Sequence, residues 1–497
     1  MLFTILFISI LFFVLSYHFI NKPYTSIFLV LLGALLLRIY SSSYSPLGKW
    51  DERYHALVAK NLIKHPLKPT LYENPILPYN NENWTENHIW LSKPILPLWF
   101  LSASIYFFGN SEWSIRIPSL ILSVLSVWLT FLIAKSIFNN IKIAWLASFF
   151  HAIHGLLIEV ASGKISSDHI ETAFLFFTEA SVWFALLTIK NEKKHPSYAI
   201  LCGITIGLAV MSKYLPGLLV LLIYPVLAFS HNKESFRKIT LNYLFMMLST
   251  GLVCLPWFIY CFNAFPKESQ TIVYALIFPM QNIVQNHSGP WWYYIEQIRI
   301  IFGELIYIPL IWLVYIIFHN KKITLQSVLL LLWIIIPLIV FSLSSTKRFT
   351  YILISSPAFF ILTSFFFFCL VKELKKIENR IYKALILITL FLVLVLPIRY
   401  SVERLKPFSK DHTLPLWTVQ LKQLNKFEIA NGVLFNYERP IEAMFYTDLT
   451  VYSQLPDKFY LDSLVAKGYQ IMINNTASLP ESLMHNKNKY IFINLNK

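Results

Sequence analysis

Three acidic residues of this chain lie beside long apolar runs, where carboxylates could act in proton transfer. Asp51 and Glu52 follow an apolar run at 24–40, and Asp168 follows another at 141–162. A carboxylate at a bilayer boundary is costly unless a cation, a hydrogen bond or a proton-transfer role compensates it. We therefore predict that all three acids are catalytic, and we expect the central chemistry at Asp51.

The elements that carry these acids are expected to be membrane helices. Hydrophobic residues make up 56% of the 497 residues and charged residues only 14%, and many apolar runs approach the length that spans a bilayer. This pattern predicts an all-α polytopic membrane protein with about 11–13 transmembrane helices. The expected spans are 3–20, 24–40, 116–138, 141–162, 169–189, 198–213, 215–230, 239–263, 292–318, 327–344, 349–371 and 384–400.

The basic residues follow the membrane pattern. The formal net charge is +16, but most Lys and Arg lie in short loops between apolar runs, as the positive-inside rule expects. This placement argues against a nucleic-acid partner. All four cysteines lie inside expected spans, and the histidines show no ligand spacing. We therefore expect no disulfide framework, no cofactor and no metal site, although a divalent metal stays open.

Lys-rich loops predict the topology. Basic loops near 190–194, 233–238, 321–322 and 372–383 are separated by even numbers of spans and are therefore predicted to be cytoplasmic. The apolar segment at 93–109 is short, aromatic-rich and holds two prolines. If this segment spanned the bilayer, Asp51 and Asp168 would face opposite sides. We predict that it lies flat on the membrane, so that both acids are extracytoplasmic.

The chain is expected to have two domains. Residues 1–400 form a transmembrane domain, whose outer loop at 41–115 carries juxtamembrane helices. Beyond residue 400, short β-type segments such as 432–435 and 470–473 alternate with helical patterns such as 458–467. This alternation predicts a small soluble α/β domain at 401–497, on the same extracytoplasmic side as Asp51.

An ordered set of motifs resembles the protein mannosyltransferase-like, type C glycosyltransferases, which include the bacterial lipid A aminoarabinose transferases. The set covers most of residues 24–400, and it is specific although no single motif is. Its members are Trp50-Asp51-Glu52, Trp90 to Trp99, Arg116-Ile117-Pro118-Ser119, Ser166-Ser167-Asp168, Gly289 to Tyr294, and Lys347 with Thr350-Tyr351-Ile352-Leu353.

The resemblance implies the type C fold in a bacterial-type inner membrane of the cell envelope. It also implies an enzyme that moves a hexose or pentose from a polyprenyl-phosphate carrier to an extracytoplasmic lipid A, protein or glycan. The residues agree, because the chain has no Walker A loop and no GxGxxG after a strand, so no nucleotide site is expected.

The resemblance also assigns roles to the acids. When the acceptor hydroxyl bonds to the anomeric carbon it loses its proton, so a carboxylate near that carbon serves as general base. Asp51 matches the family's catalytic aspartate, and Asp168 is expected to orient the acceptor or to hold a cationic group. The alternative for Asp51 and for Asp168 is capping of the helix that follows each of them.

Positive charge is needed where the polyprenyl phosphate leaves. Lys93 matches the family's phosphate-contacting lysine, and Lys347 with Tyr351 matches a later pair. The full set of predicted donor-phosphate contacts is Lys93, Lys347, Arg348, Tyr351, Lys213 and Arg53. Interfacial snorkelling is the alternative for Lys93, and a loop anchor is the alternative for Lys213. The family arginine two residues after the Asp-Glu pair falls on Tyr54 here, which puts donor specificity in doubt.

Two other function classes share some of these features. A lipid-linked oligosaccharide ligase or polymerase would act on the same side but should carry an arginine-rich outer loop, and the loop at 41–115 holds only Arg53. A lipid-linked-sugar flippase should show inverted repeats or matching broken helices, and no such internal symmetry is visible in the sequence. The sequence therefore favours the glycosyltransferase.

Overall fold

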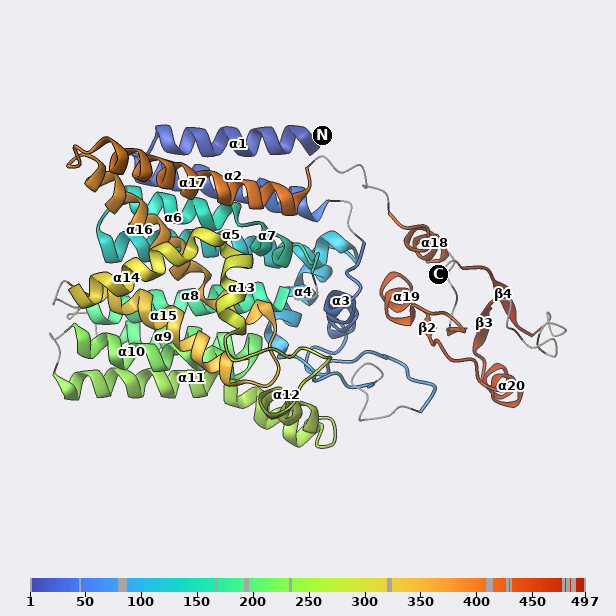
Figure 1. Cartoon of the computed structure of the whole chain (residues 1–497). Helices are drawn as coiled ribbons and strands as arrows, with labels where there is room; N and C mark the ends of the chain where they lie inside the picture. Colours follow the sequence, from blue (N-terminus) through green and yellow to red (C-terminus); the bar gives the residue numbers. More distant parts are fainter. Residues whose placement is uncertain are drawn as a thin grey trace. The chain divides into compact units, whose positions relative to one another are not determined.

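The computed structural model forms two compact units, which are described separately. The helical unit comprises Met1–Ser41, Ser119–Ser162 and Ser167–Ser409, and the mixed unit comprises Ser42–Pro118, Gly163–Ser166 and Lys410–Lys497. The structure describes residues 2–43, 46–78, 87–165, 169–191, 196–231, 235–319, 324–407, 414–425, 429, 431–475, 479, 483 and 489–495. Figure 1 labels the helices and strands.

The long helices confirm a polytopic membrane protein. Within the described residues, seven helices are long and apolar enough to cross a membrane, or up to nine if each of two bent pairs is one span. The predicted number of 11–13 is reached only with the shorter apolar helices. The seven are α2 (Pro23–Ser42), α5 (Glu112–Phe138), α8 (His169–Lys190), α11 (Phe236–Ala264), α15 (Leu325–Leu343), η3 with α16 (Phe349–Ser355 and Ser356–Leu374) and α17 (Arg380–Leu405).

The shorter helices complete the set. The bent pairs are α6 with α7 (Ile141–Ile153 and Gly155–Ala161) and α13 with η2 and α14 (Tyr293–Phe302, Glu304–Ile306 and Tyr307–His319). The shorter apolar helices are α1 (Leu2–His18), α4 (Ile95–Phe108), α9 (Ser197–Lys213) and η1 with α10 (Leu215–Leu218 and Leu219–Ser230). The sequence did not predict α12 (Gln270–Gln281).

Small residues let the central helices approach closely. Helix α9 packs against α8 on one side and α11 on the other. A Cβ atom on Gly203 would overlap Ser249 and Met246, and one on Gly207 would lie 2.7 Å from the Val253 Cβ atom. A pair of glycines four residues apart is a common contact between membrane helices, where close van der Waals packing replaces the hydrophobic effect.

Two spans that the sequence predicted as continuous are broken. The span at 141–162 bends by 57° between α6 and α7, and the span at 292–318 bends by 117° between α13 and α14. Gly303 lies at the second break with φ +92°, a conformation that glycine adopts without a steric penalty. Polar residues interrupt the apolar runs beside both breaks, with Glu159 near the first and Arg299 and Glu304 near the second. Such residues do not by themselves distinguish a bent span from a straight one, and for this reason the sequence did not reveal the bends.

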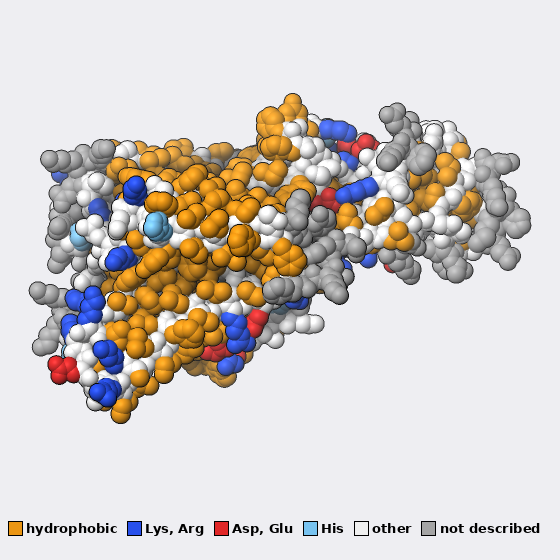
Figure 2. Space-filling model, turned by 90° about the horizontal axis from the view of Figure 1, so that it is seen from above, with side chains coloured by type: hydrophobic (Ala, Val, Ile, Leu, Met, Phe, Trp, Pro, Cys, Tyr) orange, Lys and Arg blue, Asp and Glu red, His pale blue; other side chains and the backbone are white. Residues whose placement is uncertain are grey.

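The surface of the helical unit fits a bilayer. Apolar side chains cover the middle of its face in Figure 2, and charged side chains are seen mainly towards the ends and edges of this view. Parts of the predicted cytoplasmic loops, at 192–195, 232–234 and 320–323, lie outside the described residues. The side of the membrane that each end faces stays a prediction.

The mixed unit contains a small parallel sheet. Its strands β1 (Gly432–Phe435), β2 (Thr450–Val451), β3 (Gln470–Asn474) and β4 (Ile491–Ile493) pair in the order β2-β1-β3-β4. Its helices are α3 (Asp51–Leu62), α4, α18 (Leu416–Leu424), α19 (Pro440–Tyr446) and α20 (Lys458–Ala466). The strands predicted at 432–435 and 470–473 and the helix predicted at 458–467 are confirmed. The boundary expected near 401 falls inside α17.

Helix α4 occupies the segment that we predicted to lie flat. Its 14 residues extend about 21 Å at 1.5 Å per residue, which is shorter than a hydrocarbon core of about 30 Å. It packs against α3 within the mixed unit. The length favours a juxtamembrane helix, and the flat orientation itself stays a prediction.

Candidate functional site

The first site feature is an ion pair at the start of α3. The Asp51 Oδ2 atom lies 3.0 Å from the Lys93 Nζ atom, and the two side chains are 22% and 29% exposed. Asp51 is the first residue of α3, while Lys93 precedes α4 by two residues. The packing of α3 against α4 therefore brings together two predicted site residues that are distant in sequence.

Asp51 is not the N-cap residue of α3, but it lies in the first turn, so a role in stabilising the helix N-terminus stays an alternative. The N-cap residue of α3 is Trp50, and its side chain makes no cap hydrogen bond. Asp51 and Glu52 occupy the first turn, where negative charge is favoured by the helix dipole. The Asp51 carboxylate thus lies at a helix N-terminus, pairs with a cation and is partly exposed, so a ligand can approach it.

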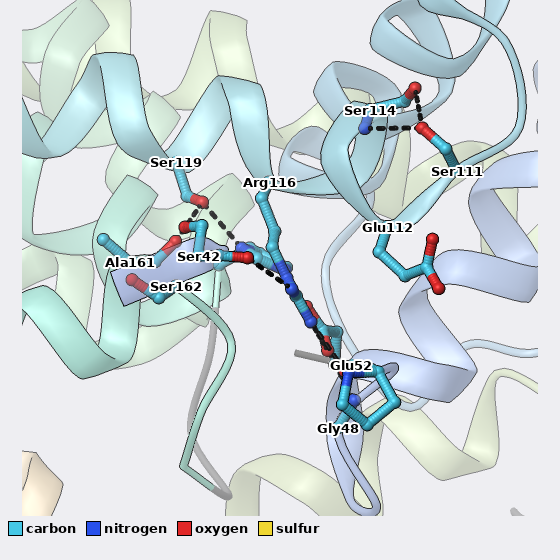
Figure 3. Close-up of polar contacts among 12 residues, drawn as sticks. Ser42, Gly48, Glu52, Ser111, Glu112, Ser114, Arg116, Ser119, Ala161 and Ser162 are labelled. Atoms are coloured by element: carbon cyan, nitrogen blue, oxygen red, sulfur yellow. Dashed lines mark hydrogen bonds and ion pairs between the residues drawn. The ribbon is translucent and has the colours of Figure 1, made fainter. Parts of the chain in front are cut away.

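Glu52 forms a buried pair with Arg116. Arg116 donates from Nε to Glu52 Oε1 over 2.9 Å and from its second terminal nitrogen to Oε2 over 3.0 Å. Both side chains are 1% exposed. The Gly48 amide also donates to Oε2, over 2.5 Å, and Figure 3 shows the Arg116 side chain directed at this carboxylate. A two-point Arg-carboxylate contact fixes both distance and orientation.

Two glycines make room for this pair. Gly163 has φ +68°, and a Cβ atom there would overlap the Glu52 carboxylate. A Cβ atom on Gly48 would lie 2.8 Å from the Gly163 carbonyl oxygen. The segment beginning at Gly163 therefore packs directly on Glu52. This segment leads towards Asp168, which lies outside the described residues, so the role of Asp168 stays a prediction.

Arg53 contacts the C-terminal part of the mixed unit. Its terminal nitrogen lies 3.1 Å from the buried Glu442 Oε1 atom on α19, and its guanidinium lies 5.0 Å from the centre of the Tyr54 ring. Farther along α3, Lys60 donates to the carbonyls of Met444 and Thr447 at the end of α19, over 2.9 and 2.7 Å. Cations are favoured at a helix C-terminus. Helix α3 is thus fixed to α19 at two points.

A second group of predicted residues meets in the helical unit. Lys213, at the end of α9, pairs with Glu171 in the first turn of α8. Its ammonium lies 4.7 Å from the centre of the Tyr351 ring and 5.4 Å from that of Phe174. Two predicted phosphate contacts, Lys213 and Tyr351, are therefore adjacent. The Glu171 pair equally fits the loop-anchor alternative for Lys213.

Lys347 and Arg348 are cations without acidic partners among the described residues. Lys347 is only 6% exposed, and its ammonium donates to the Ser344 carbonyl over 2.5 Å. Arg348 donates to the Gln285 side chain over 2.7 Å. A buried ammonium bound only to a carbonyl carries charge that an anion can neutralise. This geometry fits a phosphate contact, which stays a prediction for both residues.

The sequence-based selection missed Arg116, Gly48 and Gly163 as site residues. There was a reason in the sequence to select Arg116, because an arginine at the start of an apolar span is costly without a partner. There was no such reason to select Gly48 or Gly163, since their role depends on a contact between distant segments. In the described part of the chain, no group of three or more His, Cys, Asp or Glu could hold a metal ion.

Sequence comparisons agree with the motifs. The family model of dolichyl-phosphate-mannose-protein mannosyltransferases matches residues 92–260. The chain is 28% identical over 412 residues to an undecaprenyl phosphate-alpha-4-amino-4-deoxy-L-arabinose arabinosyl transferase of Wigglesworthia glossinidia brevipalpis, covering 79% of this chain and 68% of that protein. It is 26% identical over 284 residues to arabinosyl transferase 1 of the same kind from Pseudomonas fluorescens (strain Pf0-1), covering 54% of this chain. This match spans about half of that relative, 48% of its length.

The fold agrees as well. The structure of ArnT from Cupriavidus metallidurans bound to undecaprenyl phosphate is similar with a TM-score of 0.61 over 93% of this chain and 88% of that chain. At 13% sequence identity this likeness shows the fold. By sequence, the chain is similar to transferases of the protein mannosyltransferase and aminoarabinose transferase group, and it shares the fold of the ArnT structure.

Proposed function

We propose that this protein is an integral-membrane glycosyltransferase that moves a sugar from a polyprenyl-phosphate carrier to an acceptor outside the cytoplasm. The observation that carries the proposal is the partly exposed Asp51–Lys93 pair at the start of α3. The relatives support the donor class, since their names specify an undecaprenyl-phosphate-linked aminopentose and the similar ArnT structure holds undecaprenyl phosphate. Lipid A, a protein and a glycan remain the candidate acceptors.

In the proposed reaction Asp51 is the general base. The acceptor oxygen forms a bond to the anomeric carbon, and its proton passes to the Asp51 carboxylate. The bond between that carbon and the phosphate oxygen breaks, and the polyprenyl phosphate leaves with the bonding electrons. Lys93, which lies 3.0 Å from Asp51, is proposed to neutralise the charge that develops on the leaving phosphate.

Glu52 and Arg116 are proposed to position Asp51 and to take no part in proton transfer. Glu52 is buried and both of its oxygens accept hydrogen bonds from Arg116, so its carboxylate is poorly placed to reach a substrate. Because Glu52 is adjacent to Asp51 in the first turn of α3, fixing one fixes the direction of the other. The initial assignment of Glu52 to the catalytic acids is thereby replaced by a positioning role.

The most direct test compares cells with and without the gene. Mass spectrometry of glycolipids and glycoproteins should show one sugar missing from one acceptor class in the deletion strain. The wild-type gene should restore this sugar, and Asp51→Asn should not. Loss of a whole oligosaccharide would indicate the ligase-like alternative. An unchanged profile under conditions in which the gene is expressed would contradict the proposal.

The phosphate contacts predict a loss of donor affinity. Lys93→Ala or Lys347→Ala should weaken binding of a short-chain polyprenyl phosphate by about 1.5–3 kcal/mol, the range for a hydrogen bond to a charged group. Fluorescence titration of purified variants measures this change. Lys64→Ala is the control, because Lys64 is exposed and pairs with Glu73. Unchanged affinity in both site variants, with folded protein, would move the phosphate site to Lys213 and Arg348.

The proposed sidedness predicts a labelling pattern. Cysteines placed at Asn80 and Ser409 should react with a membrane-impermeant thiol reagent from outside, and one at Asn379, the N-cap of α17, should not. The four native cysteines are buried or half-buried, which keeps the background low. Reaction at Asn379 from outside would show that the topology, and with it the flat orientation of α4, is wrong.

A further inference from the structure

The break between α13 and α14 opens a pocket in the wall of the helical unit. The pocket has a volume of about 420 Å³ and is lined by residues of α6, α7, α13, η2, α16 and α17. Ile301, Phe302 and Glu304, which flank the break at Gly303, all line it. The volume falls in the range of about 300–1,000 Å³ that is typical of ligand sites.

The break interrupts the regular helical pairing of the backbone beside the pocket. The His154 Nε2 atom lies 2.9 Å from the Ile301 carbonyl oxygen, which the bend releases from regular helical pairing. Irregular backbone within a membrane is tolerated where it is buried in protein or faces a hydrated cavity. The bend is therefore compatible with a polar pocket at this position.

The pocket is lined by equal numbers of positively and negatively charged side chains. Tyr400 donates to Glu304, and Arg404 donates to Glu159 over 2.6 Å. Arg399, which is not a lining residue, pairs with the lining residue Glu403 over 2.8 Å. Arg299 also lines the pocket, and no described side chain forms a hydrogen bond or ion pair with its guanidinium. The charged lining residues are Arg299, Arg404, Glu304 and Glu403, whose charges sum to zero.

Apolar groups make up the rest of the lining. The rings of Phe302 and Phe359 pack with their centres 4.4 Å apart in the pocket wall. Ile300, another lining residue, is 58% exposed on the outer surface of the helical unit. A ligand of this pocket thus meets separated positive and negative groups on one side and an apolar surface, continuous with the lipid-facing helices, on the other.

We propose that this pocket binds the headgroup of a zwitterionic phospholipid that carries a primary ammonium, such as phosphatidylethanolamine. Its phosphate pairs with Arg299, and its ammonium donates to Glu304 or Glu403, which can accept further hydrogen bonds. A neutral headgroup with separated charges matches a neutral site, whereas an anionic headgroup brings uncompensated charge. A quaternary ammonium has no N–H to donate to the carboxylates. The proposal does not depend on the glycosyltransferase reaction.

Native mass spectrometry of the full-length protein tests this site. The protein is delipidated and exposed to equal amounts of dioleoyl phosphatidylethanolamine, phosphatidylcholine and phosphatidylglycerol. We expect the ethanolamine lipid to be retained most strongly, and Arg299→Gln to reduce its retention on the order of 10-fold, as expected for loss of a charged hydrogen bond. Arg299 is exposed, so this variant should fold normally.

Two controls make the outcome decisive. Arg380→Gln removes a charge at the far end of α17 and should leave lipid retention unchanged. Glu304→Gln should reduce the preference for ethanolamine over choline without abolishing phosphate binding. Equal retention of all three lipids, preference for phosphatidylglycerol, or wild-type behaviour of Arg299→Gln would each overturn the proposal.

Discussion

Replacing Asp51 by asparagine is expected to lower sugar transfer about 100-fold or more, the usual scale for loss of a general base. Asparagine keeps the shape of the side chain and can still accept a hydrogen bond from Lys93, 3.0 Å away in the native protein. It cannot take up the acceptor proton at neutral pH. Fold and donor binding should therefore remain, and the loss should appear in the rate of polyprenyl phosphate release.

The matched control is Asp448→Asn in the same unit. Asp448 also pairs with a lysine, Lys60 at 3.1 Å, but its side chain is 90% exposed, so transfer should stay near the wild-type rate. Near-normal turnover by Asp51→Asn would remove Asp51 from the reaction. A smaller loss is expected if the acceptor is a phosphate already ionised at neutral pH, because Asp51 would then act only through its charge.

Breaking the Glu52–Arg116 pair should destabilise the protein strongly. Arg116→Met leaves the Glu52 carboxylate buried without its two-point partner, and removal of one member of a buried pair costs about 3–5 kcal/mol. We expect a clear drop in the unfolding temperature of the purified protein. Activity should fall with it, since the start of α3 loses its fixed direction.

A double variant separates charge from packing. Arg116→Met combined with Glu52→Gln removes both charges, so much of the lost stability should return, while activity stays low if the pair positions Asp51. Lys64→Met, in an exposed pair, should change the unfolding temperature little. Equal stability of the single and double variants would show that the buried charge of Glu52 is not what the arginine compensates.

Much of the fold could be predicted because membrane spans and short strands are local patterns. Apolar runs located the long helices, and alternating segments located β1 and β3. The breaks near His154 and Gly303 were not predicted, since the polar residues beside them do not by themselves distinguish a bent span from a straight one. Only its positive φ marks Gly303 as the residue at the bend, and the sequence does not show that φ.

The candidate site was predictable residue by residue but not as an arrangement. Asp51 and Lys93 stood out at boundaries of apolar segments, yet their contact depends on the packing of α3 against α4. The partner of Glu52 was not predicted, because Arg116 lies 64 residues away in sequence. Nothing local marks Gly163 as the residue that must lack a side chain beside Glu52.

The attachment of α3 to α19 has a consequence for how this protein could be shortened or recombined. Arg53 and Lys60 lie on the same short helix as Asp51, and their partners Glu442 and Thr447 are supplied by the last hundred residues. A chain cut before α19 would remove the partners of both cations and loosen the helix that begins with Asp51. The C-terminal segment can therefore be exchanged for that of a relative only if α3 is exchanged with it.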